Sequence, residues 1–135
     1  MPVQVTRDGG KDSFESPDGK FVYYAKEDRR GIWRQPVGGG REQLVVDDGE
    51  LYFWDMYNHG LCLLNREPHP PRVECLDFTS RTLSTVLTLP DDHRIWDTGP
   101  SFAVSPDGQW VLYSHVQRAD NSVMSVDNLT EVIRY

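Results

Sequence analysis

The fold follows from a short motif that occurs twice, as SPDGQWVLYS at 105–114 and as SPDGKFVYYA at 16–25. Both copies begin with Ser-Pro-Asp-Gly and continue as an apolar run. In such a turn Ser accepts a local backbone hydrogen bond, Pro presets its φ, Asp suits the third position, and Gly takes positive φ at the fourth. The motif therefore predicts a type I turn with a Gly bulge, which closes a β-hairpin.

The apolar run after each turn has hydrophobic side chains on successive residues rather than on alternate ones. A strand of this kind is covered on both of its faces. An antiparallel hairpin with two covered faces needs a further sheet stacked on each side. A β-propeller meets this need, because each blade packs face to face on two neighbours.

Composition agrees with a globular β protein. The chain has 135 residues, of which 38% are hydrophobic and 11% aromatic, with four Trp and six Tyr. These numbers favour one domain with a strand-rich core. A net charge of -7 argues against a nucleic-acid surface. No apolar run approaches the roughly 18 residues of a membrane span, and the N-terminal MPVQVTRD lacks an apolar signal core. We therefore expect a cytoplasmic protein that binds neither nucleic acid nor membrane.

Turn signals divide the chain into units of about 40 to 45 residues with four strands each, which is the period of propeller blades. We expect an all-β fold of about three four-stranded antiparallel blades. The predicted blades are 11–46, 47–91 and 92–135. Residues 1–10 precede the first blade, and within them 2–7 read as a lone strand that has no hairpin partner next to it.

The residues that carry the repeat resemble TolB-like six-bladed propeller repeats. The resemblance rests on FESPDGK at 14–20 with YYAK at 23–26, on AVSPDGQW at 103–110, and on IWRQPVGGG at 32–40. It extends to the C-terminal half of propellers attached to soil-bacterial winged-helix regulators or serine/threonine kinases. The resemblance implies half of a six-bladed ring. No kinase or winged-helix residues are present, so neither activity carries over.

Side chains that often form metal or catalytic sites show no such pattern here, and we predict no catalytic residue, metal or cofactor. The histidines have no metal-ligand spacing: His59, His69, His93 and His115. Three loop carboxylates are interpreted as solvated rather than cation-binding: Asp91, Asp92 and Asp97. The turn serines, Ser16 and Ser105, lack a G-x-S-x-G elbow. The turn aspartates, Asp18 and Asp107, recur with the repeat, so their role is structural.

Glycines, aromatic residues and cysteines are likewise assigned to structure. Residues 38–40 are predicted to form a hairpin turn rather than a phosphate cradle, because no Gly-Lys-Ser/Thr follows. Core packing is favoured over a ligand cage for the aromatic residues Trp33, Tyr52, Phe53, Trp54 and Trp110. Phe21 and Trp110, which are equivalent in the two repeats, are both expected to be mostly buried.

The two cysteines, Cys62 and Cys75, occur in neither a CxxC nor a zinc spacing. We interpret them as small buried hydrophobic residues. A disulfide stays open, since the two residues are compatible with adjacent strands.

These patterns favour a non-enzymatic module for protein or peptide interaction. The alternative is a remnant or accessory propeller of an enzyme, of peptidase or sugar-acid lyase type, with a ligand in the central channel. Three blades leave apolar outer faces, so we expect a homodimer that closes a six-bladed ring. Residues 2–7 would then add beside 122–126 of the partner as a swapped clasp. Residues 129–135 compete for the same outer position, and 116–121 are expected to form a polar loop.

Overall fold

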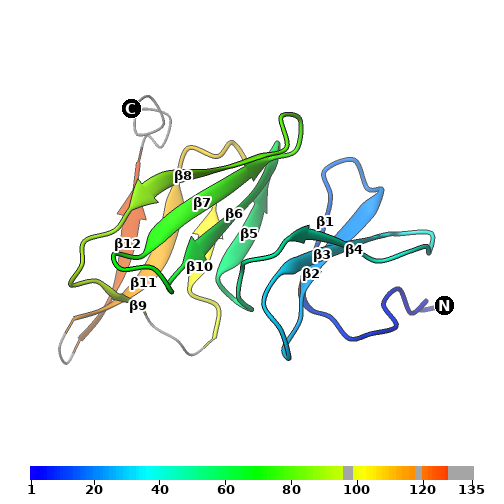
Figure 1. Cartoon of the computed structure of the whole chain (residues 1–135), viewed down its shortest axis with the longest axis horizontal. Helices are drawn as coiled ribbons and strands as arrows, with labels where there is room; N and C mark the ends of the chain where they lie inside the picture. The colour runs from blue at the N-terminus through cyan, green and yellow to red at the C-terminus, as the bar shows by residue number, and fades with distance from the viewer. Residues whose placement is uncertain (96–98, 118–119, 128–135) are drawn as a thin grey trace. The chain divides into compact units, whose positions relative to one another are not determined.

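The computed structural model describes residues 1–95, 99–117 and 120–127. Every regular element in this described part is a β-strand, and the strands form three four-stranded antiparallel sheets (Figure 1). The expectation of an all-β fold built from four-stranded antiparallel sheets is therefore confirmed. The chain divides into two compact units, 1–51 and 52–135, and each is described by itself.

The first unit contains the first sheet, with its strands in chain order: β1 (Lys11–Glu15), β2 (Phe21–Ala25), β3 (Ile32–Pro36) and β4 (Gln43–Val46). Residues 38–40 lie in the connection between the antiparallel strands β3 and β4, as the prediction of a hairpin turn required.

The second sheet opens the second unit, again with its strands in chain order: β5 (Trp54–Tyr57), β6 (Gly60–Asn65), β7 (Arg72–Asp77) and β8 (Thr82–Thr88). Every residue of β6 is buried. Because successive side chains of a strand point to opposite faces, both faces of β6 are covered. The expectation of two covered faces concerned the runs after the two turns: it holds for Tyr23 and Tyr24 of β2, which are buried, and is wrong for β11, where Leu112 is 44% exposed.

The third sheet is built differently from the other two. Its strands are β9 (Arg94–Ile95), β10 (Phe102–Val104), β11 (Val111–Gln117) and β12 (Asp120–Val126). Both β9 and β10 pair with β11, and β12 pairs with the other edge of β11. Because β9 and β10 pair with different parts of the same edge of β11, the described part of the third sheet is three strands wide, whereas the first and second sheets are four strands wide.

The prediction of a polar loop over 116–121 is wrong. The ladder between β11 and β12 continues to the pair Gln117↔Asp120. Polar residues satisfy their backbone groups through a hairpin ladder as well as apolar ones do, so their polarity alone does not define a loop.

The two Ser-Pro-Asp-Gly turns have the same hydrogen bonds. Gly19 N–H donates to the Ser16 carbonyl oxygen at 2.8 Å, and Gly108 N–H donates to the Ser105 carbonyl oxygen at 2.9 Å. Both glycines have φ of 70°. The serine hydroxyl oxygens accept from the N–H groups of Phe21 and Trp110, each at 3.0 Å. The predicted turn geometry is confirmed in both copies.

The turn aspartates are held by the same local network. The hydroxyl groups of Ser16 and Ser105 donate to the carboxylates of Asp18 and Asp107, each at 2.6 Å. Hydrogen bonds from these hydroxyls, and then from nearby backbone N–H groups, lower the pKa of both aspartates below the ordinary value. The side chains of the two serines and the two aspartates therefore stabilise the turns.

Replacing a turn glycine by Val should destabilise the protein by roughly 1 kcal/mol or more, because a β-branched residue is strained at positive φ. Gly108→Val should cost more than Gly19→Val. A Cβ atom at Gly108 would lie 3.0 Å from a ring carbon of Tyr57, whereas at Gly19 it would meet only the mobile carboxylate end of Glu15 at 3.2 Å. Thermal melts would measure the order. Gly38→Val is the control, since nothing lies within 4 Å of its added Cβ; equal melting temperatures for the three variants would contradict the turn assignment.

The core of the second unit lies between the second and third sheets. Its buried side chains come from both sheets and their connections: Phe53, Cys62, Leu64, Val73, Val86, Leu89, Phe102, Val104, Val111 and Tyr113. A hydrogen bond also joins the two sheets, since Val104 N–H donates to Asp55 Oδ2 at 2.9 Å. Burial raises the pKa of Asp55 although backbone N–H groups oppose this shift.

Residues 2–7, predicted as a lone strand, form no strand in this chain. A strand is stable only beside a neighbour that pairs its backbone groups, and none of the described strands pairs with this segment. The clasp itself requires a second copy and stays a prediction.

Candidate interaction surface

The third sheet has one buried face and one open face. Along β11, Val111 and Tyr113 are buried in the core, whereas Leu112 between them is 44% exposed. The alternation of side chains along a strand explains this difference. Ala103 is the partner of Leu112 on β10, and Val123 on β12 is 75% exposed. The open face therefore carries apolar side chains on all three strands, together with Ser114 and with Ser125, the register partner of Leu112.

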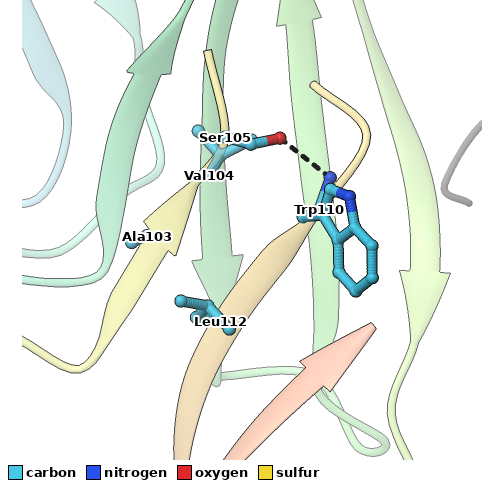
Figure 2. A pocket seen from close by; sticks show the side chains of 5 residues that line it. All are labelled: Ala103, Val104, Ser105, Trp110 and Leu112. Atoms are coloured by element: carbon cyan, nitrogen blue, oxygen red, sulfur yellow. Dashed lines mark hydrogen bonds between the residues drawn. The ribbon is translucent and has the colours of Figure 1, made fainter. Parts of the chain in front are cut away.

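A shallow hollow of about 250 Å³ lies on this part of the third sheet (Figure 2). It is lined by Ala103, Val104, Ser105, Trp110 and Leu112. The serine hydroxyl at its rim is held within the turn, because Trp110 N–H donates to Ser105 Oγ at 3.0 Å, and the surface of the hollow is almost entirely apolar. The hollow therefore presents side-chain carbon to an incoming partner. We name it, together with Val123, the open apolar face.

The expectation that Trp110 is mostly buried is wrong for the single chain. Its side chain is 43% exposed, because within the described residues of the second unit no other sheet stacks against this part of the third sheet. Phe21, its equivalent in the first repeat, is only half-buried. The Arg34 guanidinium covers the Phe21 ring from 4.4 Å, so a cation–π contact takes the place of a stacked sheet.

The other aromatic residues assigned to the core divide into two groups. Trp33, Phe53 and Trp54 are buried, as expected. Tyr52 is half-buried and has φ of 71°, in the left-handed region. Exposure among the aromatic residues that we assigned to the core is thus greatest at Trp110, on the open apolar face.

Two histidines that are distant in sequence lie together in the third sheet. The rings of His93 and His115 stack with their centroids 4.1 Å apart, and His93 Nδ1 lies 3.0 Å from the Tyr113 hydroxyl. Burial, and then the neighbouring His115 imidazole, lower the pKa of His93, whereas Asp92 opposes this shift. The remaining two histidines are apart from this pair: His59 contacts the Tyr57 ring edge-on, and His69 precedes a cis proline.

The part of the chain that the structure describes contains no metal-binding cluster, and its two turn serines are engaged in local hydrogen bonds. Within those residues, no group of three or more His, Cys, Asp or Glu side chains is arranged to hold a metal ion. Asp91 and Asp92 lie in the connection between β8 and β9, and Asp97 falls outside the described residues. The hydroxyls of Ser16 and Ser105 are occupied by the turn network.

The two cysteines form a disulfide, with an S–S distance of 2.04 Å. Cys62 of β6 and Cys75 of β7 are direct register partners. The favoured interpretation as two unlinked hydrophobic residues is therefore corrected, and the alternative that adjacency allowed is the one observed. Side chains of residues directly opposite each other in an antiparallel pair lie on the same face, which is a property that the sequence spacing alone did not establish.

A buried lysine holds the N-terminal segment against the first sheet. The side chain of Lys26 is 2% exposed, and its Nζ lies 3.0 Å from Asp8 Oδ2 and 2.7 Å from Glu42 Oε1. The Tyr24 hydroxyl donates to the other oxygen of Glu42. Burial alone would lower the pKa of Lys26, but the hydrogen bonds to Glu42 and Asp8 prevail and raise it. No pattern in the sequence indicated this cluster.

Within the described residues, the chain has no helix with the length and apolarity that crossing a bilayer requires.

Neither a protein-family profile nor a curated protein matches the sequence. The structure is similar to the crystal structure of TolB from Acinetobacter baumannii, with a TM-score of 0.55 and 11% sequence identity. The similarity covers 89% of this chain and 28% of the TolB chain, so the chain spans less than a third of that protein's length. At this identity the likeness concerns the fold alone.

The fold is that of a partial, TolB-like β-propeller. The three antiparallel sheets and the similarity to TolB both support this class. The expected resemblance to TolB-like repeats is confirmed at the level of fold. The attachment to a winged-helix regulator or a kinase stays a prediction.

Proposed function

We propose that this chain is a non-enzymatic β-propeller module for protein or peptide interaction, and that two copies close one six-bladed ring. The observation that carries the proposal is the open apolar face of the third sheet, on which Trp110, Leu112 and Val123 are 43%, 44% and 75% exposed. Soluble proteins rarely leave contiguous apolar patches of this kind in water. In a propeller, the natural cover for one face of a blade is the next blade.

A second copy can supply that cover. The first unit also exposes apolar side chains: Leu44 of β4 is 54% exposed, and Val37, in the turn that follows β3, is 41% exposed. When the third sheet of one copy packs on the first sheet of its partner, the same contact forms twice and a two-fold axis closes the ring. Six blades are the number that the resemblance to TolB-like repeats implies.

The proposal predicts the mass in solution. At micromolar concentration, light scattering or sedimentation should report about twice the 15.5 kDa chain mass. A monomer at all concentrations would contradict the ring, and so would open-ended polymers, because a ring has no free end.

The interaction role is tested on the assembled protein. A displayed peptide library panned against the wild-type dimer should yield peptides that bind the dimer but not a monomeric variant, because a rim and a central channel exist only in a closed ring. Peptides that bind both forms equally, or no peptides at all, would contradict a role for the ring in binding.

A further inference from the structure

Among the described residues, the third sheet has no strand that corresponds to β4 of the first sheet. The repeated turn joins β1 to β2 in the first sheet and β10 to β11 in the third. This correspondence aligns β12 with β3. In the first sheet β3 pairs with β4, but within the described residues β12 has no counterpart of β4 (Figure 1).

The outer edge of β12 therefore presents backbone N–H and C=O groups without a strand beside them in the described part. Such edges bind extended segments, because main-chain hydrogen bonds supply affinity and alternate side chains supply specificity. Val123 gives this edge an apolar contact, since it is 75% exposed and is paired with Ser114 of β11. The side chains of Met124 and Val126 are half-buried toward the core.

The N-terminal segment has the composition of a strand but no place in a sheet of its own chain. Residues 2–7 read PVQVTR, with Val3 81% exposed. The residues after them are anchored: Asp8 binds the buried Lys26, and a Cβ atom at Gly10 would lie 3.0 Å from a ring carbon of Tyr24. Residues 8–10 are thus held on the first sheet, while 2–7 precede the anchor.

We propose that the open edge of β12 binds residues 2–7 of a second copy as a fourth strand. This inference rests on the proposed two-copy ring, in which the third sheet of one copy lies next to the first sheet of its partner. The anchor at Lys26 then delivers the segment beside β12. A strand there pairs the edge backbone and brings Val3 or Val5 near Val123, as apolar cross-strand neighbours.

A proline scan of the full chain tests the proposal. In an added strand, alternate N–H groups point toward β12, and proline removes the N–H. Only one set of alternate residues should therefore be sensitive to proline. We expect the two prolines of that set, either Val3→Pro with Val5→Pro or Gln4→Pro with Thr6→Pro, to raise the dimer dissociation constant roughly tenfold or more. The two prolines of the other set should leave this constant nearly unchanged. Equal effects at all four positions, or no effect, would overturn the proposal.

Hydrogen exchange provides the second measurement. Those amides of 123–126 whose N–H groups point away from β11 should be protected in the wild-type dimer and lose protection in the damaging proline variants. Deletion of residues 129–135 is the matched control: if that deletion exposes these amides and the prolines do not, the chain's own C-terminal segment occupies the edge and the proposal is overturned. If the protein is a dimer and no proline weakens it, the proposed strand addition at β12 is rejected, but the proposed two-copy ring is not. A monomeric wild-type protein would reject both.

Discussion

Leu112→Glu should convert the proposed dimer into monomers. The substitution places a carboxylate on the open apolar face, where a second copy would bury it without a partner, at a cost of several kcal/mol. A ring of two copies contains this contact twice. We therefore expect the dissociation constant to rise roughly a thousandfold or more, so that sedimentation at micromolar concentration reports the mass of one chain.

Leu83→Glu is the matched control for this experiment. Leu83 lies on β8 of the second sheet and is 40% exposed, close to the 44% of Leu112. The same change in charge and size there should leave the dimer intact. If both variants stay dimeric, or if both dissociate, the open apolar face is not the contact between copies.

A mixing experiment distinguishes a ring from a back-to-back dimer. Leu44→Glu in the first sheet should also give monomers. In a ring that mixes Leu112→Glu with Leu44→Glu, one contact carries both substitutions and the other carries neither, so mixing should restore dimers in part. If two third sheets instead packed on each other, Leu44→Glu would have no effect, and the mixture would be no more dimeric than its parts.

Leu64→Ala should lower the free energy of unfolding by about 2 to 5 kcal/mol. Leu64 lies on β6, is 1% exposed, and belongs to the core between the second and third sheets. Its truncation removes apolar contacts and leaves a cavity where two sheets meet. Urea unfolding would measure the change, at one fixed protein concentration because dimer formation adds to apparent stability.

Leu83→Ala provides the comparison for the core substitution. The same atoms are removed from a side chain that is 40% exposed, so the change should stay well below that of Leu64→Ala. Repeating both in the Leu112→Glu background separates core packing from assembly. Equal losses at the two positions would contradict the core as assigned.

The hairpins and their turns could be predicted because the forces that form them are local. The hydrogen bonds of the Ser-Pro-Asp-Gly turn join residues no more than five apart, and each copy contains all the donors and acceptors that it needs. The predicted positive φ at Gly19 and Gly108 followed from the same local geometry. The apolar runs after the turns predicted strands covered on both faces, which holds for Tyr23 and Tyr24 of β2 but not for β11, where Leu112 is 44% exposed.

The candidate surface could be predicted only in part. The sequence indicated apolar outer faces, but it assigned Trp110 to the interior because the equivalent residue of a complete propeller would be covered. No sequence pattern indicated the cluster at Lys26. Its partners are Asp8 in the N-terminal segment and Glu42, which directly precedes β4. A buried charge is recognised by its distant neighbours and not by its own residue type.

The amino-acid order alone therefore accounts for where the turns lie, which segments form strands and how the hairpins succeed one another, because these features depend on neighbours a few residues away. Long-range packing accounts for the rest: the disulfide between Cys62 and Cys75, the buried Lys26, and the outer edge of β12, which pairs with none of the described strands. Each of these depends on which segments meet in space. Such meetings are set by the register and stacking of whole sheets, a property that no short stretch of sequence contains.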